Sequence, residues 1–291
     1  MEVIREKDPI KANRMARMAG KIALYALCFL VVFLVLFPLL VLVITITRSN
    51  VEIQSGFAFQ FGNSLGANFK SLIDTLTGKG FSIFRSFINS VILSFSSTAL
   101  CIYFSALTAY ACHVYDFKGK KFFEKFLLFL IIIPGQLGAV GFFRLVMNLG
   151  FYDTYIPLIL PAIAAPSTVY FIRQYMKSNF SREYVDAARM DGASEFKIFN
   201  IICLPYIKAG LATMALFGII SSWNNFMGPM TFLQSSELYT LPQIMNALRV
   251  MQIEDYGAYY LGSFLVMLPM LIVYFFMSKI IMKGVSAGGL K

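Results

Sequence analysis

Long apolar runs separated by polar connections dominate this chain. Residues 22–47, 86–115, 126–143, 154–172, 209–236 and 256–278 contain no charged side chain. At a helical rise of about 1.5 Å per residue, each run crosses roughly 30 Å of hydrocarbon, the shorter two with little spare length. A membrane β-barrel would need alternating segments of about ten residues, a different pattern. The chain is therefore predicted to be an all-α membrane protein with six transmembrane helices.

The first apolar run follows a basic tail, residues 1–21. Such a tail forms either a short helix on the membrane surface or the leading region of a signal peptide. The apolar core of a signal peptide has about 7–15 residues and ends at a small-residue cleavage pattern. The run 22–47 is longer and no such pattern ends it. We expect an uncleaved first helix in which Pro38 is tolerated as a kink.

Lysine and arginine concentrate in alternate connections. The two termini and the connections after the second and fourth runs hold 19 of the 25 basic residues. Cytoplasmic connections of membrane proteins carry such an excess. Both termini and the connection 173–208 are therefore predicted to be cytoplasmic. The first outer connection, 48–85, is too small for an independent domain.

Composition supports a membrane location. Hydrophobic residues make up 58% of the chain and charged residues 14%, against about a quarter charged in soluble domains. A net charge of +10 would suggest nucleic acid in a soluble chain. Here the topology of the basic residues explains that charge, so no nucleic-acid partner is expected.

Few residues suggest catalysis or metal binding. The four cysteines lie in or beside apolar runs without C-x-x-C spacing and are predicted to be buried, reduced thiols: Cys28, Cys101, Cys112 and Cys203. The single histidine, His113, is predicted to be a solvated loop residue. The sequence contains no metal-ligand cluster, phosphate loop or catalytic triad pattern, so no catalytic, cofactor or metal site is predicted.

The polar connection after residue 180 has the signals of two short helices. Ser181 is a good helix cap, with Glu183 in the first turn. Gly192 supplies the left-handed residue that ends the first helix. Ser194 is placed to cap a second helix, from residue 195 to about 201. The prediction is a pair of helices at an angle on the membrane face.

This connection is also more apolar than a solvated loop. Its apolar side chains are Tyr184, Phe196, Ile198 and Phe199, and the small Ala187 and Ala188 would let another surface approach closely. Exposed apolar groups with a charged rim indicate a docking site. The alternative is that they pack on the chain's own helices or on lipid headgroups.

The same connection contains a spaced motif: Asp186-Ala187-Ala188, three residues, Gly192, nine residues, Ile202, one residue, Leu204-Pro205. It resembles the EAA loop of ABC importer permeases, whose form is E-A-A, three residues, G, nine residues, I-x-L-P. Asp186 replaces the usual glutamate, which leaves open whether it reaches the same partner residue. The resemblance implies an ATPase-coupling role for Tyr184, Asp186, Ala187, Ala188, Gly192, Phe196, Ile202, Leu204 and Pro205.

Further stretches resemble the sugar-importer branch, permeases similar to the smaller maltose-transporter subunit. They are Asn89-Ser90, the connection from Ala109 to Lys120, Pro134-Gly135-Gln136, the segment Ser222 to Phe226, Tyr239-Thr240-Leu241-Pro242 and the ending Gly284 to Lys291. The resemblance covers about residues 86–291, and residues 1–85 match by layout alone.

The resemblance implies the ABC type I importer permease fold and a role as pore subunit, in the cell membrane of a prokaryote, for a sugar or oligosaccharide. Its partners would be a second, different permease, two ATPase subunits that use ATP and magnesium, and an external solute-binding protein. The expected organisation is a tail (1–21), a first helix (22–47), an outer loop (48–85), a transmembrane domain (86–283) with its coupling loop (177–208), and a C-terminal tail (284–291). The sequence has no nucleotide-binding motif of its own.

Two further segments are functional candidates, one for contact with the sugar and one for contact with the binding protein. Trp223, Asn224, Asn225 and Phe226 could border the sugar path, since aromatic rings stack on sugars and amides bond hydroxyls; helix packing is the alternative. The outer connection 237–255 is either a contact for the binding protein or a plain solvated loop. Prolines in or near several helices indicate static kinks or bends that move.

Other functional classes fit less well. A secondary transporter usually places paired charges inside its helices, and the apolar runs have none. No channel filter motif or enzyme residue set stands out. An ABC importer of peptides or amino acids remains the main alternative, followed by an ATP-independent secondary transporter.

Overall fold

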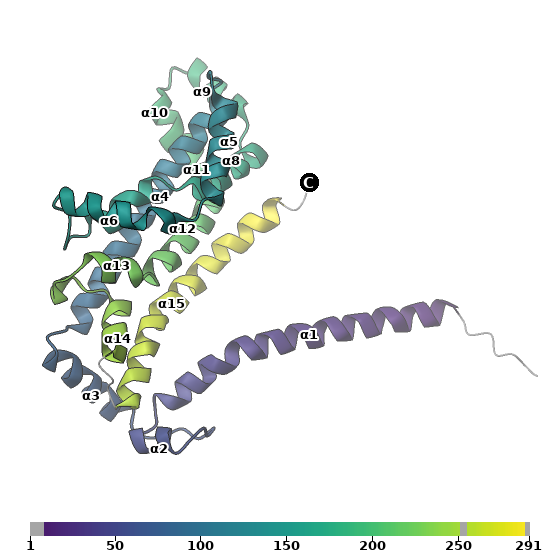
Figure 1. The fold of residues 1–291 in the computed structure, drawn as a ribbon. Helices are drawn as coiled ribbons and strands as arrows, with labels where there is room; N and C mark the ends of the chain where they lie inside the picture. Colours follow the sequence, from purple (N-terminus) through teal and green to yellow (C-terminus); the bar gives the residue numbers. More distant parts are fainter. Residues whose placement is uncertain (1–8, 251–254, 289–291) are drawn as a thin grey trace, which may run out of the picture. The chain divides into compact units, whose positions relative to one another are not determined.

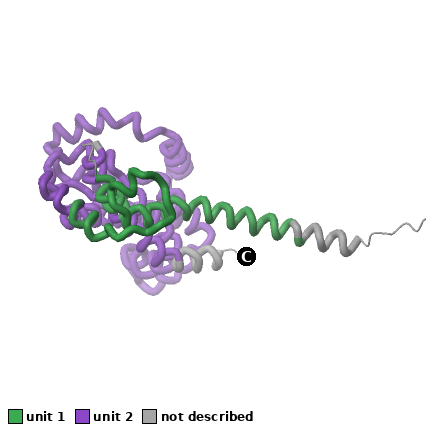
Figure 2. The backbone as a smooth tube through the Cα atoms, turned by 90° about the horizontal axis from the view of Figure 1, so that it is seen from below, with its two compact units in different colours: residues 1–71, 255–264 green, residues 72–254, 265–291 purple. Residues whose placement is uncertain are grey.

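The computed structural model describes residues 9–250 and 255–288, and the regular structure among them is entirely helical. The chain forms two compact units (Figure 2). Unit 1 contains residues 1–71 and 255–264, and unit 2 contains residues 72–254 and 265–291. Two helices, α3 (Leu65–Gly78) and α15 (Tyr256–Gly288), contribute residues to both units.

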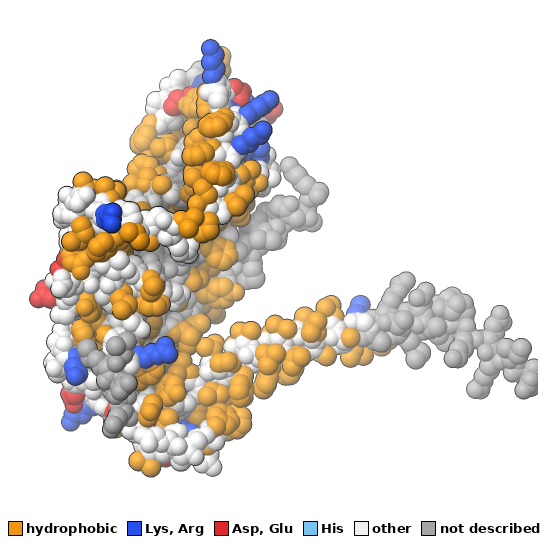
Figure 3. Space-filling view, viewed as in Figure 1, with side chains coloured by type: hydrophobic (Ala, Val, Ile, Leu, Met, Phe, Trp, Pro, Cys, Tyr) orange, Lys and Arg blue, Asp and Glu red, His pale blue; other side chains and the backbone are white. Residues whose placement is uncertain are grey.

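Unit 1 is built on the long helix α1 (Pro9–Thr45), which contains Pro38. Residues 9–21 of the basic tail therefore continue into the first apolar run as one helix. Hydrophobic side chains cover much of the visible face of the part of α1 whose side chains are described, as expected for a lipid-facing helix (Figure 3).

The outer connection 48–85 contains α2 (Asn50–Gln54) and the whole of α3. Ser49 and Glu52 form a reciprocal cap at the start of α2, in which the Glu52 carboxylate accepts from Ser49 N at 2.7 Å. The buried amide of Asn68 on α3 donates to the carbonyl oxygens of Ile46 and Arg48 at 2.9 Å each. The chain leaving α1 is thus fastened to α3.

Unit 2 is organised around α4 (Ile83–Val114), close to the predicted second span. It packs against α8 (Pro166–Asn179) and α12 (Lys208–Trp223) (Figure 1). Small residues permit close approaches among these helices. At Gly218 of α12, a Cβ would lie 3.0 Å from Thr98 Cγ2 of α4, and at Gly210 of α12 it would lie 2.7 Å from the ring of Tyr175 of α8.

The third predicted span, 126–143, is broken. Helix α5 (Lys120–Ile132) ends before Pro134, a 3-10 turn covers Gly135–Gly138, and α6 (Ala139–Asn148) follows; the two arms are bent by 86°. Proline has no amide hydrogen and disfavours helical backbone in the residue before it. Ile133 is accordingly extended, with ψ 124°.

The fourth and fifth predicted spans are also interrupted. A short helix α7 (Ile156–Ile159) and a 3-10 turn (Leu160–Ile163) precede α8. Helix α12 ends at Trp223, and α13 (Met227–Phe232) follows. The remaining elements of unit 2 are a 3-10 turn (Ser236–Leu238), α14 (Leu241–Val250) and the later part of α15.

Helices long and apolar enough to cross a membrane are found at residues 20–45, 83–114, 156–179 and 256–278. Within the described residues they number four, or up to six when each of two bent pairs, 120–148 and 195–223, is one span. The first, second and sixth predicted spans each correspond to a single helix. The third, fourth and fifth are divided into shorter helical elements. Charged side chains gather at the end of unit 2 that carries α9 and α10, the two helices described next (Figure 3).

Two predictions need correction, and one ion pair was not anticipated. His113 lies in the last turn of α4 rather than in a loop, is partly buried, and donates from Nε2 to the Phe180 carbonyl oxygen at 2.9 Å. Cys112 and Cys203 are buried as predicted, but Cys28 is exposed on α1. Arg173 of α8 is buried and pairs with Glu124 of α5, so two helices share an ion pair that the sequence did not indicate.

Candidate functional site

The segment 181–206, called the elbow below, begins with α9 (Arg182–Met190). Ser181 caps this helix, its hydroxyl oxygen accepting from Glu183 N at 3.2 Å. The helix ends at Gly192, whose φ of +77° is the predicted left-handed conformation. Ala193 N donates to the Ala188 carbonyl at 3.0 Å and closes this turn. Both local signals in the sequence are confirmed.

The second arm of the elbow is longer than predicted. Helix α10 (Glu195–Lys197) continues through a π-helical segment (Ile198–Cys203) into α11 (Leu204–Tyr206). Ser194 precedes α10, but its side chain makes no capping bond among the described residues. After Tyr206 the chain bends by 79° into α12.

One face of the elbow is buried against α4 and α8. Ile198, Phe199 and Cys203 from the second arm join Val185 and Ala188 of α9 in the core of unit 2, with Ile202 and Leu204 partly buried against it. The prediction that Ile198 and Phe199 present apolar surface is therefore wrong. Ile198 and Phe199 instead pack on the chain's own helices, which was the alternative, and Ala188 is also buried. The elbow is a packed part of the unit.

The opposite face keeps apolar side chains exposed. Phe196 is 70% exposed and Met190 is 88% exposed, and Tyr184 and Tyr206 lie with their rings 5.2 Å apart. Ala187 and Pro205 are exposed on the same segment. Charged groups such as Asp186 surround this surface, which is the composition of a docking face.

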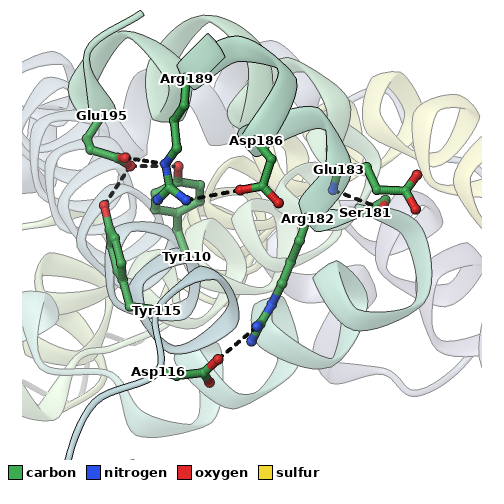
Figure 4. Close-up of polar contacts among 9 residues, drawn as sticks. All are labelled: Tyr110, Tyr115, Asp116, Ser181, Arg182, Glu183, Asp186, Arg189 and Glu195. Atoms are coloured by element: carbon green, nitrogen blue, oxygen red, sulfur yellow. Dashed lines mark hydrogen bonds and ion pairs between the residues drawn. The ribbon is translucent and has the colours of Figure 1, made fainter.

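Arg189 joins the two arms of the elbow (Figure 4). Its guanidinium donates to Glu195 Oε1 at 2.7 Å and to Asp186 Oδ1 at 3.2 Å. Its central carbon also lies 5.7 Å from the ring centroid of Tyr115, a cation–π contact. The hydrogen bond from Arg189 lowers the pKa of the Glu195 carboxyl, so the ion pair persists below the pH at which an ordinary glutamate takes up a proton.

A second ion pair fastens α9 to the turn after α4. Arg182 Nη1 donates to Asp116 Oδ2 at 3.0 Å, and Lys120 Nζ donates to Asp116 Oδ1 at 2.8 Å. Hydrogen bonds from Lys120 and Arg182 lower the pKa of Asp116 to about 2. Because this pKa is depressed, the contact is fully formed above the ordinary carboxyl pKa and is lost only as the pH falls through about 2.

A cavity of about 660 Å³ lies between α4, α8 and α12 within unit 2. Its hydroxyl-bearing lining residues are Ser97, Thr98, Ser167, Thr168, Ser221 and Ser222, joined by the amide of Asn225. Ser97 and Ser222 form a hydrogen bond of 3.0 Å between their hydroxyl oxygens. The buried Thr98 Oγ1 has no hydrogen-bond partner among the described residues. Ser167 and Ser221 are exposed, so the lining presents hydroxyls to the cavity.

The four residues predicted near the sugar path have different positions. Trp223 is 2% exposed; its Nε1 donates to the Val266 carbonyl at 3.0 Å and its ring meets Phe87 edge to face. Asn225 lines the cavity, and its Oδ1 accepts from the backbone of α13. Asn224 and Phe226 are exposed and are not among the lining residues. The structure thus brings one of the four to the cavity and packs Trp223 between helices.

Sequence reasoning missed the hydroxyl-bearing residues of the cavity. Their signal was present in α4, where Ser94, Ser97, Thr98, Cys101 and Ser105 recur at helical spacing within an apolar run. Such residues also bond their own helix backbone, as Ser94 does to the Ser90 carbonyl at 2.7 Å. The pattern therefore does not identify a cavity until the neighbouring helices are placed.

The outer connection 237–255 is described except for residues 251–254, so Glu254 lies outside the described residues. Its beginning is fastened to α4, with Asn89 Nδ2 donating to the carbonyl oxygens of Glu237 and Tyr239 at 2.8 and 3.0 Å. Arg85 pairs with the Glu237 carboxylate at 2.9 Å. This start of the connection is held in place on α4.

Residues 101–286, which include the elbow and most of the cavity lining, match the family model of the binding-protein-dependent transport system inner membrane component. The chain belongs to this family. It is accordingly a multi-pass cell-membrane protein and an ABC transporter permease. Permeases of this family work with ATPase and binding-protein partners.

Named relatives cover most of the chain. The arabinooligosaccharides transport system permease protein AraQ of Halalkalibacterium halodurans is 35% identical over 90% of this chain and 93% of its own length. The lactose transport system permease protein LacG of Rhizobium radiobacter is 28% identical over 89% and 93%. The fold is similar to that in a crystal structure of a bacterial ABC transporter involved in alginate import, with TM-score 0.76, 22% identity, and coverage of 91% and 97%.

Proposed function

We propose that this protein is a pore-forming permease subunit of an ATP-driven importer for a sugar or oligosaccharide. The names of the relatives, which specify arabinooligosaccharides and lactose, support this substrate class. The single observation that carries the coupling role is the elbow, which is packed into unit 2 on one face and exposes apolar side chains on the other. The chain itself binds no cofactor in this proposal; two partner ATPase subunits use ATP and magnesium.

In the full assembly, a second, different permease completes the pore and an external binding protein delivers the sugar, with the outer connection 237–255 as its contact. Both termini and the elbow face the cytoplasm, in keeping with the distribution of basic residues. The ATPase subunits dock on the exposed face of the elbow. ATP binding then shifts the balance between inward-facing and outward-facing states because the two states bind ATP differently.

The complex reconstituted in lipid vesicles tests this function. ATP hydrolysis should rise when sugar-loaded binding protein is added, and labelled sugar should accumulate only when ATP is present. Stimulation by a peptide-loaded or amino-acid-loaded binding protein instead would reject the sugar assignment. Uptake by the isolated chain, driven by an ion gradient, would reject the coupling role altogether.

The docking face predicts a specific loss in one variant. Phe196→Ser should reduce recovery of the ATPase subunits with the purified permease about tenfold, because it removes an exposed aromatic anchor from the interface. Phe122→Ser is the matched control, since Phe122 on α5 is 74% exposed and Phe196 is 70% exposed. Co-purification from membranes measures both. Equal recovery for the two variants would show that the ATPase subunits do not dock on the exposed face of the elbow.

The hydroxyl-lined cavity is proposed as part of the sugar path. Ser221→Ala should raise the sugar concentration needed for half-maximal uptake about fivefold, since it removes an exposed hydroxyl of the lining that is available to the sugar. Ser105→Ala deletes a buried hydroxyl of α4 outside the cavity lining, and should leave uptake unchanged. Transport assays across a sugar concentration series distinguish them. A normal concentration dependence in Ser221→Ala would place the path elsewhere.

A further inference from the structure

The elbow is joined to α4 by a polar contact that its sequence motif does not include. Glu195, the first residue of α10, uses both carboxylate oxygens. Oε1 accepts from Arg189 of α9 at 2.7 Å, while Oε2 accepts from the hydroxyl of Tyr115 at 2.6 Å (Figure 4). The Tyr110 hydroxyl also approaches Oε2, at 3.3 Å. One carboxylate therefore connects both arms of the elbow to the end of α4.

The α4 end of this connection is rigidly held. Tyr110 is buried in the last turns of α4, with its ring 5.4 Å from that of Phe199 on the second arm. Tyr115 is the residue at which α4 ends, five positions after Tyr110. A displacement of Glu195 relative to Tyr110 would break packing as well as hydrogen bonds, and packed interiors resist such small shifts. The elbow and the end of α4 are thus built to move together.

The position of Asp186 fits the same arrangement. Its carboxylate accepts from Arg189 at 3.2 Å, so its charge is met inside the elbow. Arg189 in turn is held by Glu195. The acidic residue of the motif is therefore coupled to Glu195 through one guanidinium. A second tie, between Arg182 and Asp116, joins α9 to the turn that follows Tyr115.

The far part of α4 lines the cavity. Ser97, Thr98 and Cys101 lie about two and a half to three and a half turns before Tyr110 on the same continuous helix. A helix without a break transmits a displacement along its axis, whereas α5–α6 is interrupted and the elbow meets α12 through a bend of 79°. Motion of the elbow would thus reach the cavity through α4 without passing a hinge.

We propose that Glu195 is a positioning residue for energy coupling: it locks the elbow to α4 through Tyr115 and Tyr110, so that ATPase movement reaches the cavity wall. Asp186 acts within this lock, through Arg189. The proposal rests on the proposed function, since it assumes that the ATPase subunits dock on the elbow. It goes beyond that function by assigning the transmission of movement to a contact outside the spaced motif.

Two conservative variants and their combination test the lock in the complete reconstituted complex. Glu195→Gln removes the charge that holds Arg189, and Tyr115→Phe removes only one hydroxyl. Each should lower the sugar taken up per ATP hydrolysed about tenfold, because hydrogen bonds to charged groups are among the stronger ones. The ATPase subunits should still co-purify. In the double variant, the sugar taken up per ATP hydrolysed should be no lower than in the more affected single variant, because both changes break the same connection.

Asp74→Asn is the control, since it removes a carboxylate charge from an exposed site of α3 outside the elbow. It should retain the wild-type ratio of uptake to hydrolysis. A wild-type ratio in Glu195→Gln, losses that multiply in the double variant, or loss of the ATPase subunits from either single variant would each overturn the lock. If the wild-type complex itself shows no ATP-dependent uptake, the proposed function fails as well, so the two failures are distinguishable.

Discussion

Replacing Gly192 with valine is expected to lower ATP-dependent sugar uptake about thirtyfold while the protein still inserts in the membrane. Gly192 has φ +77°, a conformation that a β-branched residue rarely adopts. No atom lies within 4 Å of the position that a Cβ would occupy, so the effect comes from the backbone and not from a clash. The strain is relieved by turning the second arm of the elbow away from α9, which disturbs both the docking face and the Arg189 contacts.

Uptake and ATP hydrolysis in membrane vesicles measure this change together. Gly192→Asn is the matched control, because asparagine tolerates the left-handed conformation better than other non-glycine residues. It should keep most of the coupled uptake. Full coupled uptake in Gly192→Val would show that the angle between the two arms does not matter for energy transfer, and the elbow would lose its proposed role.

Trp223→Ala is expected to destabilise the protein by about 3 kcal/mol, since it empties a large buried site. Trp223 packs against Phe87 of α4 and donates a hydrogen bond to the Val266 carbonyl of α15. Its removal leaves a cavity at this contact and deletes the hydrogen bond to Val266. Thermal unfolding of the purified complex in lipid nanodiscs measures the loss, and the neighbouring Asn224→Ala should change stability little because Asn224 is exposed.

The same variant decides between the two roles considered for Trp223. If the residue packs helices, the remaining folded Trp223→Ala protein should bind sugar with wild-type affinity, and Trp223→Phe should recover part of the stability. Wild-type stability combined with a loss of sugar affinity would instead place the indole in the sugar path, against its burial between α4, α12 and α15.

Features that depend on neighbours along the chain could be predicted from the sequence. The lengths of the apolar runs indicated membrane spans, since hydrocarbon thickness sets a minimum helix length. Ser181 and Gly192 marked the ends of α9 because a cap and a left-handed turn involve hydrogen bonds over only a few residues. The spaced motif also placed the elbow in a family that the comparison then confirmed. The orientation of the termini and the second permease stay predictions.

Side-chain roles that depend on distant partners could not be predicted in this way. Ile198 and Phe196 are two residues apart and equally apolar, yet one is buried against α4 and the other exposed. The distinction depends on which face of the second arm meets unit 2, and hydropathy alone does not contain that information. Trp223 likewise has its partners in Phe87 of α4 and Val266 of α15, far away in the sequence.

By itself the sequence determined that this is a helical membrane permease with a capped elbow, because hydropathy, capping and motif spacing are properties of consecutive residues. Only the tertiary structure decided that Glu195 joins the elbow to α4 and that hydroxyls from three helices share one cavity. Those contacts join residues far apart in the sequence, 85 positions between Tyr110 and Glu195 and 125 between Ser97 and Ser222. Their geometry is set by how the helices pack, which no local pattern specifies.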